Sequence, residues 1–311
     1  LADDLLSVTA LAYGNGSTQK PLIIAPAMDG GMFTNEATQA NIQILQQRGA
    51  IIIGPEEGYL ASGLKARGRM TEPQDIFTRL RYMLSRNGDL KGKQVIVTAG
   101  GTREVIDPVR VISNRSSGKQ GYAIAQEALD RGADVILITA PSQLDVPFAA
   151  TCVPVSTADE MEQAVMQNIA KADALIMAAA VSDFTISDTS KEKIKRKEGK
   201  LALKLVATDD ILMQVAQVRK KSGKPDVVIG FAAESQDLIA NAQKKLAAKD
   251  LDMIVANDIS SQTSGFEVDK NKVTVLLKND QKIDLPLMGK DEVAEKLIDQ
   301  MVELLKKAKK A

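Results

Sequence analysis

The feature that most constrains the fold is a regular alternation of short apolar runs and helical patterns along most of the 311 residues. QVIVT at 94–98 and ADVILIT at 133–139, for example, flank a helical pattern that ends at Arg131 and Gly132. Strands that alternate with helices in this way form a mostly parallel sheet with helices on both faces. The sequence therefore predicts an α/β fold built on a doubly wound, Rossmann-like sheet.

Local signals divide and extend this pattern. KVTVLLK at 272–278 and QKIDLPL at 281–287 are separated by a short Asn-Asp turn, which predicts a hairpin added to the sheet. Thr157 and Glu160 predict a capping box at the start of a helix. GDLKG at 88–92 is the natural linker, so we expect two domains, 1–88 and 89–311. Because the chain opens at Leu1 within a helical pattern, we expect an N-terminal part to be missing.

Composition excludes several classes of function. Lys plus Arg equals Asp plus Glu, 40 against 40, so no overall field favours nucleic acid or an acidic membrane. The single cysteine, Cys152, excludes an internal disulfide, and we expect a reducing cytoplasm. No apolar run is long enough to span a bilayer. The chain has no histidine, which excludes histidine acid–base chemistry and histidine metal ligands.

A long polar stretch, TAGGTREVIDPVRVISNRSSGKQG at 98–121, follows the strand at 94–98 and leads into a helix. Open α/β sheets bind ligands at this end of their strands. A dinucleotide fingerprint is absent, because the glycine spacing fails and no acid follows the strand at 133–139. NAD and NADP are therefore disfavoured. The stretch contains three glycines that allow close approach of the backbone to a ligand, Gly100, Gly101 and Gly118. It also contains four cations that can bind anions, Arg103, Arg110, Arg115 and Lys119.

Four further elements could complete a nucleotide site, and each also has a simpler explanation. The alanines of DALIMAAAVSDF at 173–184 could offer backbone groups to a flat ring or serve close packing, and Asp183 follows them at the strand exit. KEKIKRKEG at 191–199 is either a solvated face or a partner for a triphosphate. Lys245 and Lys249 share one helix face, and Phe231 is either a stacking ring or a core residue. Together they favour a nucleoside triphosphate site without a Walker loop.

From about Leu90 onward, the chain resembles the ligase domain of the bifunctional phosphopantothenoylcysteine decarboxylase/phosphopantothenate–cysteine ligase. TAGGTREVIDPVR, SNRSSGKQG, AAAVSDF, KIKRK, GFAAES and KDLDMIVANDIS match in order and spacing. The resemblance implies that Asn114 holds an acyl-cytidylate intermediate, that Lys193 is catalytic, and that Gly118 and Lys119 help Asn114 to contact the substrate. It implies CTP binding by Met177, Ala178, Ala179, Asp183, Lys193, Asp209, Asp210, Ile211, Leu212, Phe231, Lys245 and Lys249. It also implies Mg²⁺ with the triphosphate, through ligands the sequence does not identify, and a homodimer.

Residues 1–88 resemble the second half of the flavodoxin-like, flavin-dependent decarboxylase domain of the same family, through LADDLLS, PAMDGGM and ASGLKARGRM. Asp29 stands where the family has Asn, and Ser62 stands where it has the catalytic Cys. A serine hydroxyl is far less acidic than a thiol, so we do not expect it to replace the proton donor. We expect FMN binding and decarboxylation of a full-length parent and not of this chain. Higher oligomers are possible through this domain.

The predicted reaction joins 4′-phosphopantothenate and L-cysteine in two steps. The carboxylate attacks the α-phosphate of CTP and releases pyrophosphate, and the cysteine amine then displaces CMP. Lysines and Mg²⁺ would offset the charge in the first step, and the amide of Asn114 would donate to the acyl oxygen in the second. The alternative is a non-catalytic regulatory or assembly subunit that keeps the fold.

Overall fold

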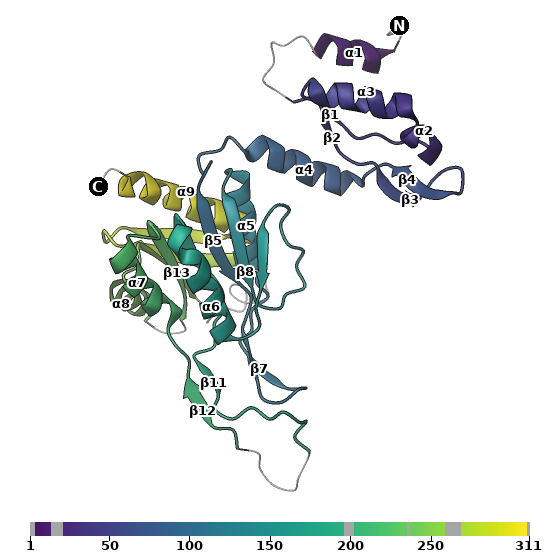
Figure 1. The fold of residues 1–311 in the computed structure, drawn as a ribbon. Helices are drawn as coiled ribbons and strands as arrows, with labels where there is room; N and C mark the ends of the chain where they lie inside the picture. Colours follow the sequence, from purple (N-terminus) through teal and green to yellow (C-terminus); the bar gives the residue numbers. More distant parts are fainter. Residues whose placement is uncertain (1–3, 14–20, 196–201, 235–236, 259–268, 310–311) are drawn as a thin grey trace. The chain divides into compact units, whose positions relative to one another are not determined.

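The computed structural model describes residues 4–13, 21–195, 202–234, 237–258 and 269–309. The chain forms two compact units, Leu1–Arg81 and Tyr82–Ala311 (Figure 1). The KIKRK, GFAAES and KDLDMIVANDIS motifs each run into residues outside the described ranges. Within those ranges, no helix combines the length and the apolar character needed to cross a membrane.

The first unit consists of short elements around a small parallel pair of strands. β1 and β2 run parallel, and Ile23 pairs with Ile51 and Ile24 with Ile52. A second pair, β3 and β4, is antiparallel and was not predicted, because its strands are polar and largely exposed. The elements are α1 (Leu5–Tyr13), β1 (Ile23–Ile24), α2 (Gly30–Thr34), α3 (Glu36–Gln47), β2 (Ile51–Ile52), β3 (Glu56–Tyr59), β4 (Lys65–Arg69) and α4 (Pro73–Ser85), which continues past Arg81.

The second unit is built on an eight-stranded sheet in the order β16-β15-β14-β13-β10-β5-β8-β9. The six strands from β14 to β9 run parallel, and β15 and β16 form the antiparallel hairpin. This confirms the predicted doubly wound fold with an added hairpin. The strands are β5 (Gln94–Ala99), β8 (Asp134–Thr139), β9 (Thr151–Pro154), β10 (Ala174–Met177), β13 (Val227–Glu234), β14 (Met253–Asp258), β15 (Lys270–Leu277) and β16 (Lys282–Gly289).

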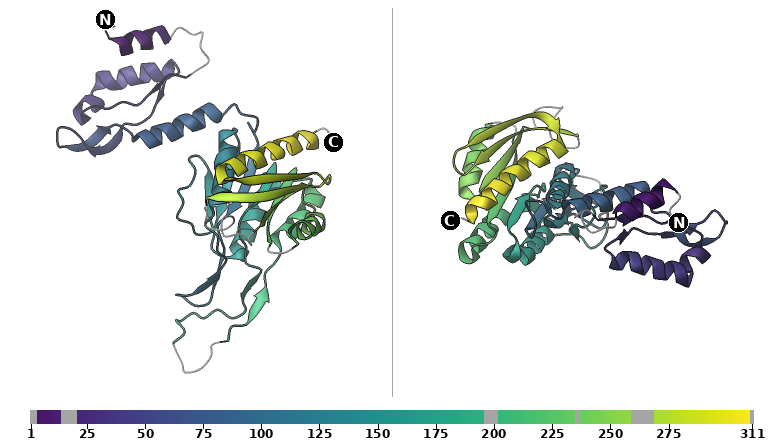
Figure 2. Two further views of the ribbon diagram at one scale, coloured as in Figure 1. Left: turned by 180° about the vertical axis from the view of Figure 1, so that it is seen from behind. Right: turned by 90° about the horizontal axis from the view of Figure 1, so that it is seen from above.

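Helices cover both faces of this sheet (Figures 1 and 2). Alternate residues of each strand point to opposite faces, so Val95 and Val97 pack into one core and Ile96 into the other. The first core includes α5 (Lys119–Asp130) and α9 (Lys290–Ala308). The second includes α6 (Ala158–Asn168), α7 (Ile211–Ser222) and α8 (Leu238–Ala248), with the short 3-10 turn η1 (Ile169–Lys171) after α6. The capping box predicted at Thr157 and Glu160 begins α6, as expected.

Two small antiparallel pairs stand outside the sheet and were not predicted. They are β6 (Arg103–Val105) with β7 (Val111–Ser113), and β11 (Phe184–Ile186) with β12 (Leu205–Ala207). In Figure 1, β7, β11 and β12 are labelled below the sheet. Each strand has only three residues, so its existence depends on tertiary pairing more than on any pattern in the sequence.

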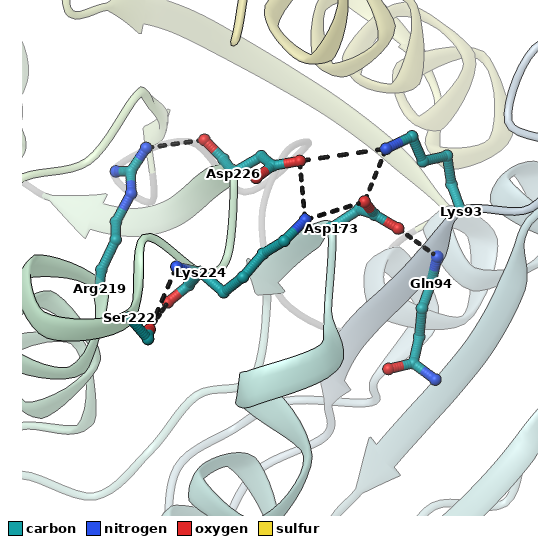
Figure 3. A network of polar contacts seen from close by, with 7 residues as sticks. All are labelled: Lys93, Gln94, Asp173, Arg219, Ser222, Lys224 and Asp226. Carbon is teal, nitrogen blue, oxygen red and sulfur yellow. Dashed lines mark hydrogen bonds and ion pairs between the residues drawn. The ribbon is translucent and has the colours of Figure 1, made fainter. Parts of the chain in front are cut away.

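A polar network fastens the amino ends of three central strands (Figure 3). Lys93, just before β5, lies 2.6 Å from Asp173, just before β10. Lys224 lies 3.2 Å from Asp173 and 3.0 Å from Asp226, just before β13. Burial alone would raise the pKa of Asp173, but hydrogen bonds from Lys93, the Gln94 N–H and Lys224 outweigh it and lower that pKa. The network lies at the amino ends of these strands, whereas ligands are expected at the carboxyl ends.

Candidate functional site

Strand order identifies a topological switch point between β5 and β10. The chain leaves β5 towards β8 and β9, and then returns to β10 on the other side of β5. A crevice opens at the carboxyl ends of the strands at such a point, and ligands bind there in doubly wound folds. The residues that leave β10, 178–183, therefore lie where a ligand site is expected.

Two hollows flank this exit segment. The first hollow measures about 380 Å³ and the second about 280 Å³. Residues 114–121, Asn257, Asn271 and Lys290 line only the first hollow. Met177, residues 208–212, Lys245 and Lys249 line only the second. The two hollows share a wall made of Ala179, Val181, Asp183 and Phe231.

The loop before α5 forms one side of the first hollow. Gly118, the N-cap residue of α5, adopts a left-handed conformation with φ of +80°, which glycine adopts without strain. Gly121 allows α5 to approach β5 closely, because a Cβ at this position would lie 2.6 Å from the Cβ of Ala99. No side chain caps the start of α5. The unpaired N–H groups at such a helix start can bind an anion.

Asn114 is held against the exit of β10. Its amide nitrogen donates to the carbonyl oxygens of Ala180 at 3.3 Å and Val181 at 3.1 Å. Next to it, Ser113 Oγ donates to the Thr102 carbonyl at 2.8 Å. Both amide hydrogens of Asn114 are thus occupied in this state, so it can donate to a substrate only by exchanging one of these bonds.

The second hollow brings cations to the start of a helix. The Asp210 carboxylate caps α7 by accepting from the N–H groups of Leu212 at 3.1 Å and Met213 at 3.3 Å. The same carboxylate pairs with Lys249 at 2.9 Å. Lys245, one turn before Lys249 on α8, also lines this hollow. An anionic ligand here would meet two ammonium groups and the carboxylates of Asp183, Asp209 and Asp210, the last of which already caps α7.

The structure brings together most of the residues predicted to bind CTP. The members of that set that line the second hollow are Met177, Ala179, Asp183, Asp209, Asp210, Ile211, Leu212, Phe231, Lys245 and Lys249. Ala178 lines the first hollow instead, together with Asn114, Gly118 and Lys119. The predicted nucleotide set and the predicted substrate set are therefore neighbours across one wall.

Lys193 does not line either hollow. It is exposed in the connection between β11 and β12. The adjoining Ile194 is fixed elsewhere: its N–H donates to the buried carboxylate of Asp107 at 3.2 Å, and its carbonyl accepts from Arg110 at 3.3 Å. The lysine therefore needs a movement of this connection, or another chain, to meet a ligand in the second hollow.

Sequence reasoning missed Asn257, Asn271 and Lys290. Each is a single residue on a different element, and only the order of β13, β14 and β15 brings them to one hollow. Asn257 lies within a quoted motif but carried no assigned role. Lys290 could have attracted notice because it is a cation in the first turn of a helix, where the macrodipole disfavours positive charge.

In the first unit, Ser62 and Asp29 meet. Ser62 Oγ donates to Asp29 Oδ2 at 2.6 Å, and Asp29 also caps α2 by accepting from the Gly31 N–H at 3.0 Å. The Ser62 hydrogen bond, followed by that of Gly31, lowers the pKa of Asp29. A hydroxyl bound to a carboxylate is a poor substitute for an acidic thiol. These residues do not fit thiol-dependent flavin decarboxylation, and no step through a flavin is assigned to them.

Magnesium would need few protein ligands in such a site. No group of three or more His, Cys, Asp or Glu side chains suited to a metal occurs within the described ranges. Mg²⁺ is commonly bound by one or two carboxylates together with substrate phosphates. Asp183, in the wall shared by the hollows, is a carboxylate of the required type.

Comparisons with known proteins assign both units to families. Residues 90–305 match the family described as the DNA/pantothenate metabolism flavoprotein C-terminal domain, and residues 1–85 match the family described as flavoprotein. A coenzyme A biosynthesis bifunctional protein CoaBC from Bacillus subtilis is 41% identical over 309 residues, covering 98% of this chain and 74% of that protein. A cysteine/cysteine sulfinic acid decarboxylase from an unknown prokaryotic organism is 39% identical over 310 residues, covering 98% of this chain and 84% of that protein.

A solved structure shares the second unit. The C-terminal domain of a coenzyme A biosynthesis bifunctional protein CoaBC is 38% identical, has a TM-score of 0.60, and covers 71% of this chain and all of that chain. Fold and hollows together define a doubly wound α/β domain with two lysine-containing hollows at its switch point, joined to a flavoprotein-family unit. The chain belongs to the family of the coenzyme A biosynthesis bifunctional proteins.

Proposed function

We propose that residues 89–311 form a CTP-dependent phosphopantothenate–cysteine ligase of coenzyme A biosynthesis. The observation that carries the proposal is the wall shared by the two hollows. The residues predicted to bind the substrate line the first hollow, and most of those predicted to bind CTP line the second. Family membership supports it, because the relatives at 41% identity are named for coenzyme A biosynthesis. CTP would occupy the second hollow, and 4′-phosphopantothenate would occupy the first.

The first step is mainly a problem of charge, because a carboxylate attacks a phosphate. Lys245 and Lys249 would offset the charge of the triphosphate. Mg²⁺, when bound to the triphosphate, would supply further charge neutralisation. The wall that contains Asp183 and Phe231 lines both hollows, so the two reactants would lie on either side of it.

The second step is attack of the cysteine amine on the acyl carbonyl with loss of CMP. Negative charge then develops on the acyl oxygen, and one or two donors positioned for it lower the barrier. Asn114 is suited to this role because its amide nitrogen lies at the exit of β10, where the shared wall begins. In the reacting complex, one of its bonds to Ala180 or Val181 is exchanged for a bond to the acyl oxygen.

Lys193 is assigned to the triphosphate of CTP. This role requires that its side chain reach the second hollow, either of its own chain or of a second copy of the chain. A homodimer through this domain is part of the proposal. It is supported by exposed apolar side chains on the two small strand pairs, Phe184, Leu205 and Val111, and in the turn between β6 and β7, Val109. Co-expressing Lys193→Gln with Asn114→Asp tests the arrangement: recovered activity in the mixed dimer means that one site combines Asn114 of one chain with Lys193 of the other.

The alternative is that the first unit is a non-catalytic assembly module. The Ser62–Asp29 hydrogen bond favours this for residues 1–88, since it leaves no acidic thiol at that position. Pyrophosphate release and amide formation with CTP, phosphopantothenate and cysteine test the ligase proposal directly. A chain that binds CTP and the acid without turnover would support the non-catalytic alternative for the whole protein.

A further inference from the structure

The exit segment, residues 178–183, contributes Ala179, Val181 and Asp183 to the wall that both hollows share. Its position therefore sets where the two reactants would lie relative to one another. β10 ends at Met177, where it makes its last ladder pairs with β5 and β13. Backbone groups beyond that point need other partners, because a buried N–H or C=O group without one is costly.

Buried threonine hydroxyls supply some of these partners. The Ala179 N–H donates to Thr98 Oγ1 at 3.2 Å, and the Ser182 N–H donates to Thr102 Oγ1 at 2.9 Å. Thr98 and Thr102 are fully buried, and hydrogen bonds away from water are electrostatically stronger. On the other side of the segment, Thr208 Oγ1 donates to the Ser182 carbonyl at 2.7 Å. Ser182 is therefore held through both its N–H and its carbonyl.

Thr102 also joins the exit segment to the residues beside Asn114. Its N–H donates to the Ala180 carbonyl at 3.3 Å, and its own carbonyl accepts from Ser113 Oγ at 2.8 Å. The Asn114 amide nitrogen donates to the same Ala180 carbonyl. One buried residue thus uses its N–H, its carbonyl and its hydroxyl to fix the wall and the approach to Asn114 together.

Thr102 lines neither hollow, so it would act on the reaction only through geometry. Asp183 directly follows Ser182, and its carbonyl accepts from the Thr208 N–H at 3.0 Å. Loss of the Thr102 hydroxyl would free the Ser182 N–H and loosen the end of the wall that carries the Asp183 carboxylate. A misplacement of about 1 Å between reacting groups can lower a rate about 100-fold.

We propose that Thr102 is a positioning residue for the ligase reaction, because its hydroxyl holds Ser182, and with it Asp183, in register with Asn114. This inference rests on the proposed function and adds to it a residue that touches neither reactant. The wall lines both hollows, so loss of the hydroxyl slows the reaction between bound CTP and bound acid more than it weakens the binding of either.

The test removes the hydroxyl of Thr102 in the full chain and keeps the shape of the side chain. Thr102→Val replaces the hydroxyl by a methyl group, and Thr102→Ser keeps the hydroxyl. Thr139→Val is the matched control, because Thr139 on β8 is also buried and its hydroxyl bonds to Tyr122 and to the Ala140 carbonyl.

Thr102→Val should lower kcat for acid-dependent pyrophosphate release by about 10- to 100-fold, the cost of a small misplacement. The KM values for CTP and 4′-phosphopantothenate should change by less than about threefold, because the contacts that bind each reactant remain. Thr102→Ser should recover most of the lost kcat, and Thr139→Val should keep both kcat and KM. Urea unfolding of each variant gives the folded fraction, so that kcat is compared per folded chain.

Ser113→Ala provides a second test on an exposed residue, where the fold does not depend on the side chain. It removes the bond to the Thr102 carbonyl that fixes the approach to Asn114. Amide formation in single-turnover quench experiments should slow by about 2- to 10-fold, the equivalent of one neutral hydrogen bond, while pyrophosphate release continues.

A purely structural role of Thr102 predicts easier unfolding of Thr102→Val with an unchanged kcat per folded chain, and this result would overturn the inference. A rise in KM alone would overturn it as well. If Thr102→Val does not fold, normal amide formation by Ser113→Ala decides against the inference. Absence of turnover in the unmodified chain would instead overturn the proposed function.

Discussion

Replacing Asn114 by Asp should separate the two chemical steps. In this structure the amide nitrogen donates to two backbone carbonyls at 3.3 and 3.1 Å. A carboxylate would lose both bonds and repel both oxygens, and two neutral hydrogen bonds contribute about 1–3 kcal/mol in total. It would also remove a donor to the acyl oxygen, which costs about 10²–10³ in rate. We expect pyrophosphate release to continue while amide formation slows by at least that factor.

Single-turnover quench experiments with labelled CTP measure both steps in one sample. The predicted trace is a burst of pyrophosphate with accumulation of acyl-cytidylate and little amide. Asn279→Asp, in the exposed turn between β15 and β16, is the control for an added carboxylate, and should behave like the unmodified chain. Thermal unfolding of both variants separates a local loss of stability from a loss of chemistry. Amide formation at the normal rate, or an equal block of both steps, would refute the assigned role.

Three further predictions concern other carboxylates and Ser62. Asp210→Ala should lower the free energy of unfolding by about 0.5–2 kcal/mol through loss of the α7 cap; unchanged urea unfolding would contradict this. Asp173 has a lowered pKa, so its charge stabilises the fold above about pH 4 and that contribution is lost as pH falls further. Asp173→Asn should therefore cost about 1.5–3 kcal/mol at pH 7 and flatten the acid limb of a stability–pH curve, and an unchanged curve would count against the network. Ser62→Ala should leave pyrophosphate release unchanged, and the unmodified chain should release no CO₂ from phosphopantothenoylcysteine with added FMN; measurable CO₂ would restore a decarboxylase role.

Much of the architecture could be predicted because it follows strong local signals. Apolar strands between helices fix the alternation, and the turn at Asn279 and Asp280 fixes the hairpin of β15 and β16. The pairs β3–β4 and β6–β7 could not be predicted in the same way. Their strands are short and half polar, so pairing is decided by what packs beside them.

The residues of the candidate site also differ in whether the sequence could predict them. Asp183 was found because it follows a predicted strand, at the end of the sheet where ligands bind, whereas Asp210 was implied only by the resemblance to the ligase family. Lys290 and Asn271 were not, because they come together only through a strand order that local patterns do not specify. Lys193 is the opposite case, because a motif identified it but the structure does not place it at either hollow. Its neighbour Ile194 is held by Asp107 instead.

The most direct test of the central claim is a competition between CTP and ATP with phosphopantothenate and cysteine present. The account predicts pyrophosphate release that depends on the acid, amide product in equal amount, and a clear preference for CTP. Equal use of the two nucleotides would contradict the nucleotide assignment. No acid-dependent pyrophosphate with either nucleotide would contradict the ligase assignment itself.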